Sequence, residues 1–326
     1  MRSCMCALVV TLLAAATAGL QSQSQQPQAT PTALPAPPPR DPTWAFPIQN
    51  GSVPAESPGP KSLEGSTKQY TPAEIDDLRN PPDWFPGAHR PAPSIVQTGH
   101  GDALACGACH LMSGLGHPES ADLTGFTADY LLQQIDDFKA GTRTDSARMN
   151  GISNAISAEE ARQAAEWFAS LPRQTFVRVV EAAMVPRTFV GQGRMRFVDP
   201  AGGMEPIGER IITLPESQER ARLRDPRSGF VAYVPPGSIA KGKALAEGGD
   251  GKTIACDICH GEGMQGLANV PRLAGLHPIY ITRQLYLFRE GDRTGADAPL
   301  MRKPLANMND EDILYVSAYL ASLPPQ

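Results

Sequence analysis

A pentapeptide that occurs twice constrains this chain more than any other feature. The first copy is Cys106-Gly-Ala-Cys109-His110 and the second is Cys256-Asp-Ile-Cys259-His260. The pattern is typical of c-type haem attachment, in which both thiols bond to one porphyrin and the histidine binds its iron. A single copy would also fit a zinc half-site, a disulfide or a redox-active cysteine pair. Because both copies are followed by the same downstream pattern, we interpret them as two haem sites.

The repetition extends far beyond the pentapeptides. After a two-residue insertion, Met149 aligns with Met301 and 169–172 aligns with 321–324. A repeat on this scale predicts two copies of one domain, at residues 90–172 and 235–326. An offset of 150 residues aligns Leu123, Gly125, Tyr130, Gln134, Phe138, Gly141 and Arg143 with Leu273, Gly275, Tyr280, Gln284, Phe288, Gly291 and Arg293.

Both copies predict short helices, so the expected fold class is all-α. A middle helix carries apolar residues at helical spacing and ends at Gly141 or Gly291. The last helix begins with a capping-box pattern, Ser157 with Glu160 and Asn309 with Asp312. We interpret the aromatic residues of these helices as core.

The copies differ where they begin. Residues 238–246 predict a good first helix capped by Ser238, in which Gly242 permits close contact with the last helix near Tyr319. The first copy offers only 94–99, so its helix is expected to be shorter.

Methionine is the natural candidate for the second axial iron ligand, since a thioether favours ferrous iron. Met149 and Met301 lie far enough beyond His110 and His260 for the chain to reach the opposite face of the ring. Met112 and Met264 follow their histidines too closely. Met308 is the rival in the second copy, but it aligns with an apolar position and is expected in the core. His100 is the alternative to watch as a second histidine ligand, whereas His277 is expected to cap a helix or lie at the surface.

The first 89 residues predict export followed by a tether. Residues 1–18 have the charge, the apolar run and the small-residue ending of a cleaved signal peptide, with an uncleaved anchor as the alternative. Residues 19–60 are rich in Pro, Gln, Ser and Ala, which predicts a disordered tether. Residues 61–89 form an N-terminal extension, with a short helix after Thr71 and with Trp84 and Phe85 expected to pack on the first domain. The expected location is the periplasm, with all four cysteines of the mature chain in the haem motifs.

An inter-domain segment spans residues 173–234. It holds ten basic and seven acidic side chains, and alternating stretches at 175–180 and 194–198 predict strands. We favour an ordered linker that covers the two domains, and the alternative is a docking surface for a redox partner.

These residues resemble class I cytochromes c in tandem, the c4-type dihaem cytochromes of bacteria. The resemblance covers about half of the mature chain and implies two all-α cytochrome domains joined by a long, partly extended segment. It implies two covalently attached haem c groups, held by Cys106, Cys109, Cys256 and Cys259, with His110, Met149, His260 and Met301 as iron ligands. In that family a proline carbonyl accepts a hydrogen bond from the histidine. Pro271 matches it, whereas the first copy has Ala121 and leaves the acceptor open.

The function expected from the resemblance is electron transfer between redox protein donors and acceptors, either free or within a respiratory or dehydrogenase complex. The alternative is a dihaem peroxidase, which needs an open iron position that the paired methionines do not offer. The net charge of −5 gives no indication of nucleic-acid binding, for which an excess of basic residues is typical.

Overall fold

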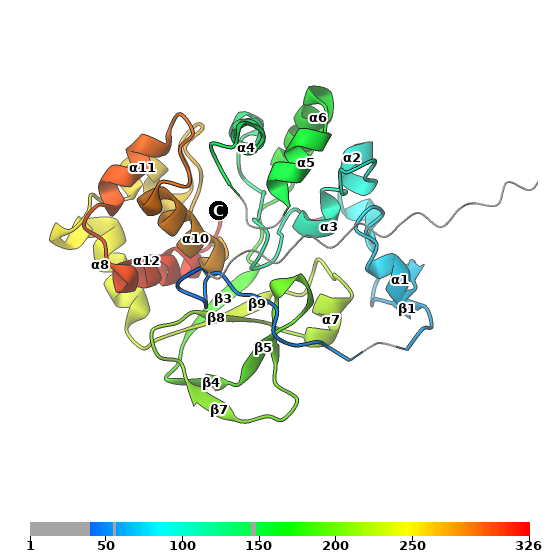
Figure 1. Ribbon diagram of the computed structural model, residues 1–326, viewed down its shortest axis with the longest axis horizontal. Coiled ribbons are helices and arrows are strands. Elements are labelled where there is room, and N and C mark those ends of the chain that lie inside the picture. The colour runs from blue at the N-terminus through cyan, green and yellow to red at the C-terminus, as the bar shows by residue number, and fades with distance from the viewer. Residues whose placement is uncertain (1–39, 55–56, 145–147) are drawn as a thin grey trace, which may run out of the picture. The chain divides into compact units, whose positions relative to one another are not determined.

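The computed structural model describes residues 40–54, 57–144 and 148–326 (Figure 1). The predicted signal peptide and residues 19–39 of the predicted tether lie outside the described residues. All described residues belong to one compact unit. In this part of the chain, no helix combines the length and the apolar character needed to cross a bilayer.

The first repeat folds into the short helices that its sequence predicts. The capping box of Ser157 and Glu160 begins the last helix, and Gly141 ends the middle one with a φ of 74°. The first helix has only four residues, so the predicted shortening is confirmed. The helices of this repeat are α2 (Ser94–Gln97), α3 (Gly107–His110), α4 (Ala128–Ala140), α5 (Met149–Ala155) and α6 (Ala158–Ala169).

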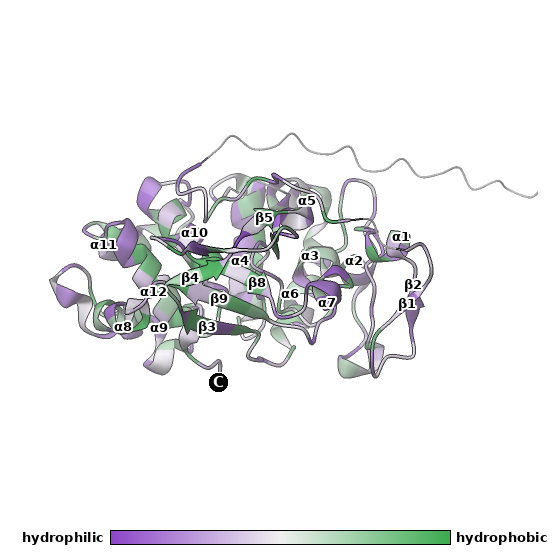
Figure 2. Ribbon diagram, turned by 90° about the horizontal axis from the view of Figure 1, so that it is seen from below, coloured by the Kyte–Doolittle hydropathy of each residue, from purple (hydrophilic) through white to green (hydrophobic). Residues whose placement is uncertain are grey.

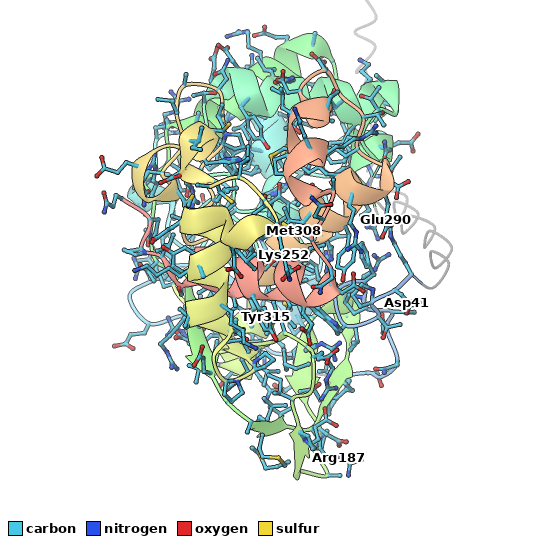
Figure 3. The ribbon with its side chains drawn as sticks, turned by 90° about the vertical axis from the view of Figure 1, so that its left-hand side faces the viewer. Asp41, Arg187, Lys252, Glu290, Met308 and Tyr315 are labelled. Carbon is cyan, nitrogen blue, oxygen red and sulfur yellow. The ribbon has the colours of Figure 1, made fainter. Side chains whose placement is uncertain are left out.

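The second repeat has the same order with a longer first helix. A Cβ on Gly242 would lie 1.9 Å from the carbonyl oxygen of Tyr315, which confirms the predicted close contact with the last helix. The first and last helices of this repeat lie against each other near Tyr315 (Figure 3). Ser238 is not the cap, because its hydroxyl donates to the Pro235 carbonyl and Gly237 precedes the helix. The helices are α8 (Ser238–Gly248), α9 (Asp257–His260), α10 (Pro278–Glu290), α11 (Ala298–Leu305) and α12 (Asp310–Ser322), with one-turn 3-10 helices at Gly249–Gly251 and Glu262–Met264.

The structure is mostly helical, as expected, and the inter-domain segment adds small sheets to the predicted all-α fold class. β3 (Val177–Glu181) and β6 (Arg196–Val198) lie at the stretches 175–180 and 194–198, where strands were predicted. β9 pairs in parallel with β3 and antiparallel with β8, and both β8 and β9 are largely buried and hydrophobic (Figure 2). Two antiparallel ribbons, β4 with β7 and β5 with β6, complete it. The elements are β3 (Val177–Glu181), β4 (Met184–Pro186), β5 (Thr188–Val190), a 3-10 turn (Gln192–Arg194), β6 (Arg196–Val198), β7 (Met204–Pro206), β8 (Ile212–Pro215), α7 (Gln218–Arg222) and β9 (Phe230–Val234).

The residues that precede the first repeat pack more tightly than their composition predicts. Trp44 and Ala45 are buried, so the part of the expected tether that the structure describes is folded against the protein. Trp84 and Phe85 do not pack on the first domain as expected. They form a separate cluster with Leu223 of the inter-domain segment. The elements here are β1 (Lys61–Ser62), β2 (Gln69–Tyr70), α1 (Pro72–Ile75) and a 3-10 turn (Pro86–Ala88).

Candidate functional site

The two motif histidines are oriented in the same way. His110 Nδ1 lies 2.8 Å from the Ala121 carbonyl oxygen, and His260 Nδ1 lies 2.7 Å from that of Pro271. A backbone carbonyl only accepts hydrogen bonds, so each Nδ1 must carry the proton and each Nε2 presents its lone pair. This is the tautomer of a metal-bound histidine with an outer hydrogen-bond acceptor. The acceptor in the first copy, which sequence left open, is therefore Ala121.

His260 also passes a test of fit to an iron ligand. The side chain is 5% exposed, and its Nε2 has no hydrogen-bond partner among the described residues. Burial without a partner costs free energy, which a metal bond at this nitrogen would remove. Burial also lowers the pKa of His260, and this favours the neutral ring that metal binding requires.

The cysteines stand at the start of each motif helix. Cys106 precedes α3 and Cys256 precedes α9, so one turn of helix separates the first thiol from the histidine. Burial raises the pKa of Cys106 to about 12 and that of Cys256 to about 11. Cys106, Cys256 and Cys259 take part in no disulfide among the described residues. The donor set therefore fits a covalently held haem c better than a structural disulfide.

The predicted methionine ligands lie on equivalent helices. Met149 begins α5 and Met301 lies within α11, and both are partly buried against the main hydrophobic cluster. Their rivals are deeper: Met112, Met264 and Met308 are 5%, 2% and 7% exposed. Met308 is thus a core residue, as predicted, while Met149 and Met301 stay the predicted ligands.

The structure places two other histidines for which the sequence suggested roles. His100 lies at the surface, where its Nε2 is 2.6 Å from Glu160 Oε1. His277 corrects the prediction of a capping or surface role. It is 1% exposed, makes no capping bond, and places Nε2 3.2 Å from the Leu115 carbonyl oxygen of the first repeat.

Two arginines at matching positions lie across the contact between the repeats. Arg143 donates to Gln134 Oε1 at 2.8 Å within its own repeat and to Gln284 Oε1 at 2.9 Å in the other. Arg293 donates to Gln284 at 3.1 Å and also to Gln134. Both arginines are at most 7% exposed. The sequence aligned these positions but gave no sign that they meet.

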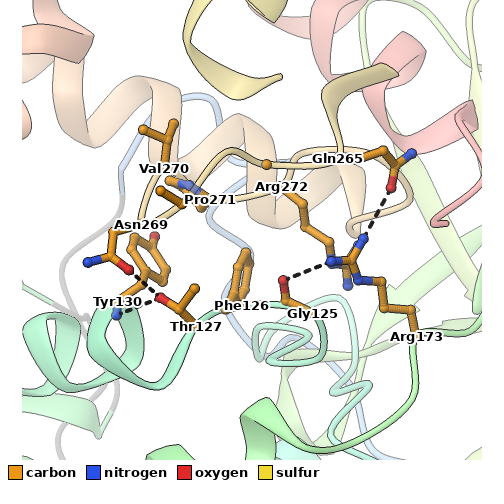
Figure 4. Close-up of a pocket in the computed structure, with 12 residues that line it drawn as sticks. Gly125, Phe126, Thr127, Tyr130, Arg173, Gln265, Asn269, Val270, Pro271 and Arg272 are labelled. Atoms are coloured by element: carbon orange, nitrogen blue, oxygen red, sulfur yellow. Dashed lines mark hydrogen bonds between the residues drawn. The ribbon is translucent and has the colours of Figure 1, made fainter. Parts of the chain in front are cut away.

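A buried ion pair adds a second contact between the repeats. Arg272 and Asp122 are 0% and 2% exposed, and Arg272 also donates to the Thr124 carbonyl at 2.8 Å. Each charged residue directly follows a carbonyl that accepts from a motif histidine, at Ala121 or Pro271. A cavity of about 150 Å³ borders this contact, and Thr127 bonds Asn269 across it at 2.7 Å (Figure 4). The offset of 150 pairs Asp122 with Arg272, so their opposite charges were a signal that sequence reasoning missed.

The first motif is enclosed by segments from outside the repeat. Ala105 N–H donates to the Leu78 carbonyl at 3.1 Å, and a Cβ on Gly107 would lie 3.7 Å from Pro81. On another side, Arg224 donates to the Ala108 carbonyl. Ala108 is consequently 2% exposed.

Within residues 40–54, 57–144 and 148–326, no segment covers the second motif in this way. Ile258 takes the place of Ala108 and is 69% exposed, and Asp257 and Cys259 are exposed beside it. Ile254 and Leu267 nearby are 51% and 59% exposed. The N-terminal extension and the inter-domain segment therefore shield one of the two equivalent motifs.

No family model matches the sequence. The chain is 28% identical to cytochrome c4 of Stutzerimonas stutzeri, over 70% of this chain and 89% of that protein. It is 37% identical to cytochrome c-554(548) of Halomonas halodenitrificans, over 24% of this chain and 94% of that protein. It is 26% identical to the thiosulfate dehydrogenase electron acceptor of Thiomonas intermedia, over 72% of this chain and 85% of that protein.

Proposed function

Because this chain belongs to the c4-type dihaem cytochromes c, we propose that it carries electrons in the periplasm through two His/Met haems. The observation that carries the proposal is the pair of equivalent sites. Each has a C-x-x-C-H motif whose histidine donates through Nδ1 to a backbone carbonyl. The two repeats that carry these sites contact each other through shared glutamines and a buried ion pair.

In this function the protein would hold the two haem groups and orient the side chains that bind their irons. A haem c bound at each motif supplies a one-electron ferric/ferrous couple. Cys106 and Cys109, or Cys256 and Cys259, would hold the ring covalently, and the oriented histidine would bind its iron through Nε2. The carbonyl acceptors at Ala121 and Pro271 lock the imidazole in position and raise its basicity. Met149 and Met301 would supply the remaining iron ligand at each site and so exclude substrates from the iron.

The proposed partners are redox proteins, with a periplasmic dehydrogenase as electron donor. Support comes from the relative whose printed name is thiosulfate dehydrogenase electron acceptor. A carrier of this kind receives electrons at one site and delivers them at another, so two haem sites in repeats that contact each other suit it. The donor and the acceptor would be proteins.

The test is a spectroscopic and redox titration of the purified holoprotein. We expect two haem c groups per chain, low-spin spectra, little reaction with carbon monoxide, and reduction by thiosulfate only when a thiosulfate dehydrogenase is added. Catalytic turnover of hydrogen peroxide, with one iron becoming five-coordinate on partial reduction, would contradict the carrier and favour a peroxidase.

The methionine assignments have their own test. Met149→Ala and Met301→Ala should each convert one haem to high spin and leave the other low spin, since each removes a single thioether ligand. Met308→Ala is the matched control in the second repeat and should keep both haems low spin. A Met301→Ala protein with two unchanged low-spin haems would overturn that ligand assignment.

A further inference from the structure

Arg224, which belongs to neither repeat, reaches into the first haem motif. It follows α7 in the inter-domain segment, and its Nη1 donates to the carbonyl oxygen of Ala108. Ala108 stands between the two cysteines of the motif. A positive charge from 116 residues further along the chain is thus placed against the attachment site.

The position of Arg224 is held from both sides. The preceding residue, Leu223, is 6% exposed, and its carbonyl accepts a 2.7 Å bond from Trp84 Nε1. The following residue, Asp225, is 3% exposed and pairs with Arg220 at 2.6 Å. Arg224 itself has a φ of 56°, a left-handed conformation that a non-glycine residue adopts at some cost. A backbone fixed in this way leaves the guanidinium little freedom to move away.

The second motif carries the opposite charge at the matching place. Asp257 and Ile258 replace Gly107 and Ala108, and both are exposed to solvent. The two motifs therefore differ in the sign of the nearby charge as well as in their exposure to solvent. A partly buried cation lies beside the first motif, and an exposed carboxylate lies within the second.

We infer that Arg224 raises the reduction potential of the first haem above that of the second. The inference rests on the proposed function, since it takes one haem at each motif. A ferric haem carries one more positive charge than a ferrous haem, so a nearby cation destabilises the oxidised form. The effect is stronger where protein replaces water, as it does around Ala108. The solvent-exposed carboxylate of Asp257 acts in the opposite direction on the second haem but is screened.

The first experiment is a titration of the wild-type holoprotein, with the haems distinguished by their paramagnetically shifted proton resonances. We expect the first haem to be reduced at the higher potential. The reverse order in a protein that carries two low-spin haems and accepts electrons from its partner would overturn this inference while leaving the proposed function intact.

The second experiment compares Arg224→Gln with Arg224→Lys. The glutamine variant should lower the equilibrium constant for reduction of the first haem at least threefold, about 28 mV at 59 mV per tenfold change. The second haem should be unaffected, and lysine should restore most of the shift. Arg210→Gln removes the same charge from the same segment, where Arg210 contacts Glu205, and should shift neither haem. An unchanged first potential in a folded Arg224→Gln protein would refute the inference, and if that variant does not fold, the wild-type order decides.

Discussion

The first and second haem motifs are copies of one pentapeptide in unequal surroundings. Ala108 in the first is 2% exposed, whereas Ile258, its counterpart in the second, is 69% exposed. The histidines nevertheless make the same hydrogen bond, at 2.8 Å and 2.7 Å. The repeated part of the chain thus sets the orientation of the motif histidine, and the segments outside the repeat set how far each motif is exposed.

This difference gives the two sites separate tasks. A docked partner can approach the second motif directly, because no described segment covers Ile258. It meets the N-terminal extension and the inter-domain segment before it reaches the first. We therefore expect electrons from an outside donor to enter mainly through the second domain.

The largest expected effect comes from placing the same lysine in both motifs. Ala108→Lys forces a charge and extra volume into an enclosed site, which should destabilise the fold by about 5 kcal/mol or more. Ile258→Lys should change stability by less than about 0.5 kcal/mol and should slow electron exchange with a protein partner. Chemical denaturation of the holoproteins and stopped-flow reduction measure the two outcomes. Equal destabilisation by both substitutions would contradict the conclusion that the first motif is enclosed and the second is exposed.

Removing Trp84, which joins the N-terminal extension to the inter-domain segment beside the first motif, should have the next largest effect on stability. Trp84 is 2% exposed and bonds the Leu223 carbonyl. Trp84→Ala should cost about 3–5 kcal/mol and should loosen both segments around the first motif. Hydrogen exchange should then rise at 104–110 and stay unchanged at 254–260. If the first motif stays protected in this variant, the cover does not depend on Trp84.

Acid should destabilise the contact between the repeats at which His277 of the second repeat meets the Leu115 carbonyl of the first. Burial lowers the pKa of His277 to about 4, from about 6.5 in the unfolded chain. Its contribution to the free energy of unfolding, about 3 kcal/mol, is present above pH 6.5 and is lost as the pH falls towards 4. The matching residue of the first repeat is Thr127, which does not titrate. Denaturation midpoints between pH 7 and 4 should therefore fall less steeply in His277→Thr than in wild type, and parallel profiles would contradict the assignment.

The smallest expected effect comes from a substitution in the first helix of the second repeat, which is longer than its counterpart in the first repeat. Gly242→Ala should cost about 1–3 kcal/mol, because a Cβ would meet Tyr315 and force α8 away from α12. Gly248→Ala on the same helix has open space around its Cβ and is the control. Thermal melting followed through the absorbance of each haem should show the loss in the second domain alone. A loss shared equally by both domains would show that they do not unfold separately.

Local signals predicted the helical parts well. The capping boxes at Ser157 and Asn309, the C-terminal glycines and the close approach at Gly242 all depend on residues near one another in sequence or on the steric limits of a single position. The orientation of His260 by Pro271 followed from the resemblance, and the structure extends it to Ala121.

The remaining features depend on contacts between distant segments. Nothing near Val177 in sequence indicates that its partner in a parallel ladder is Phe230. The same holds for Trp84 with Leu223, and for Arg224 with Ala108, which are 116 residues apart. A polar residue such as His277 looks suited to a surface until the carbonyl that it meets is known. Charge and periodicity describe each segment, but they do not say which two surfaces come together.

The Asp122–Arg272 pair bears on how the two halves recognise each other. They occupy the same position in the two repeats and meet where Arg143 and Arg293 contact both glutamines reciprocally. This is the geometry of a two-fold axis, on which equivalent residues of identical subunits would face each other. Two first repeats would oppose aspartate to aspartate, and two second repeats arginine to arginine, each buried without a counter-charge. The opposite charges therefore favour pairing of a first repeat with a second repeat, and they disfavour pairing of two like halves from different molecules.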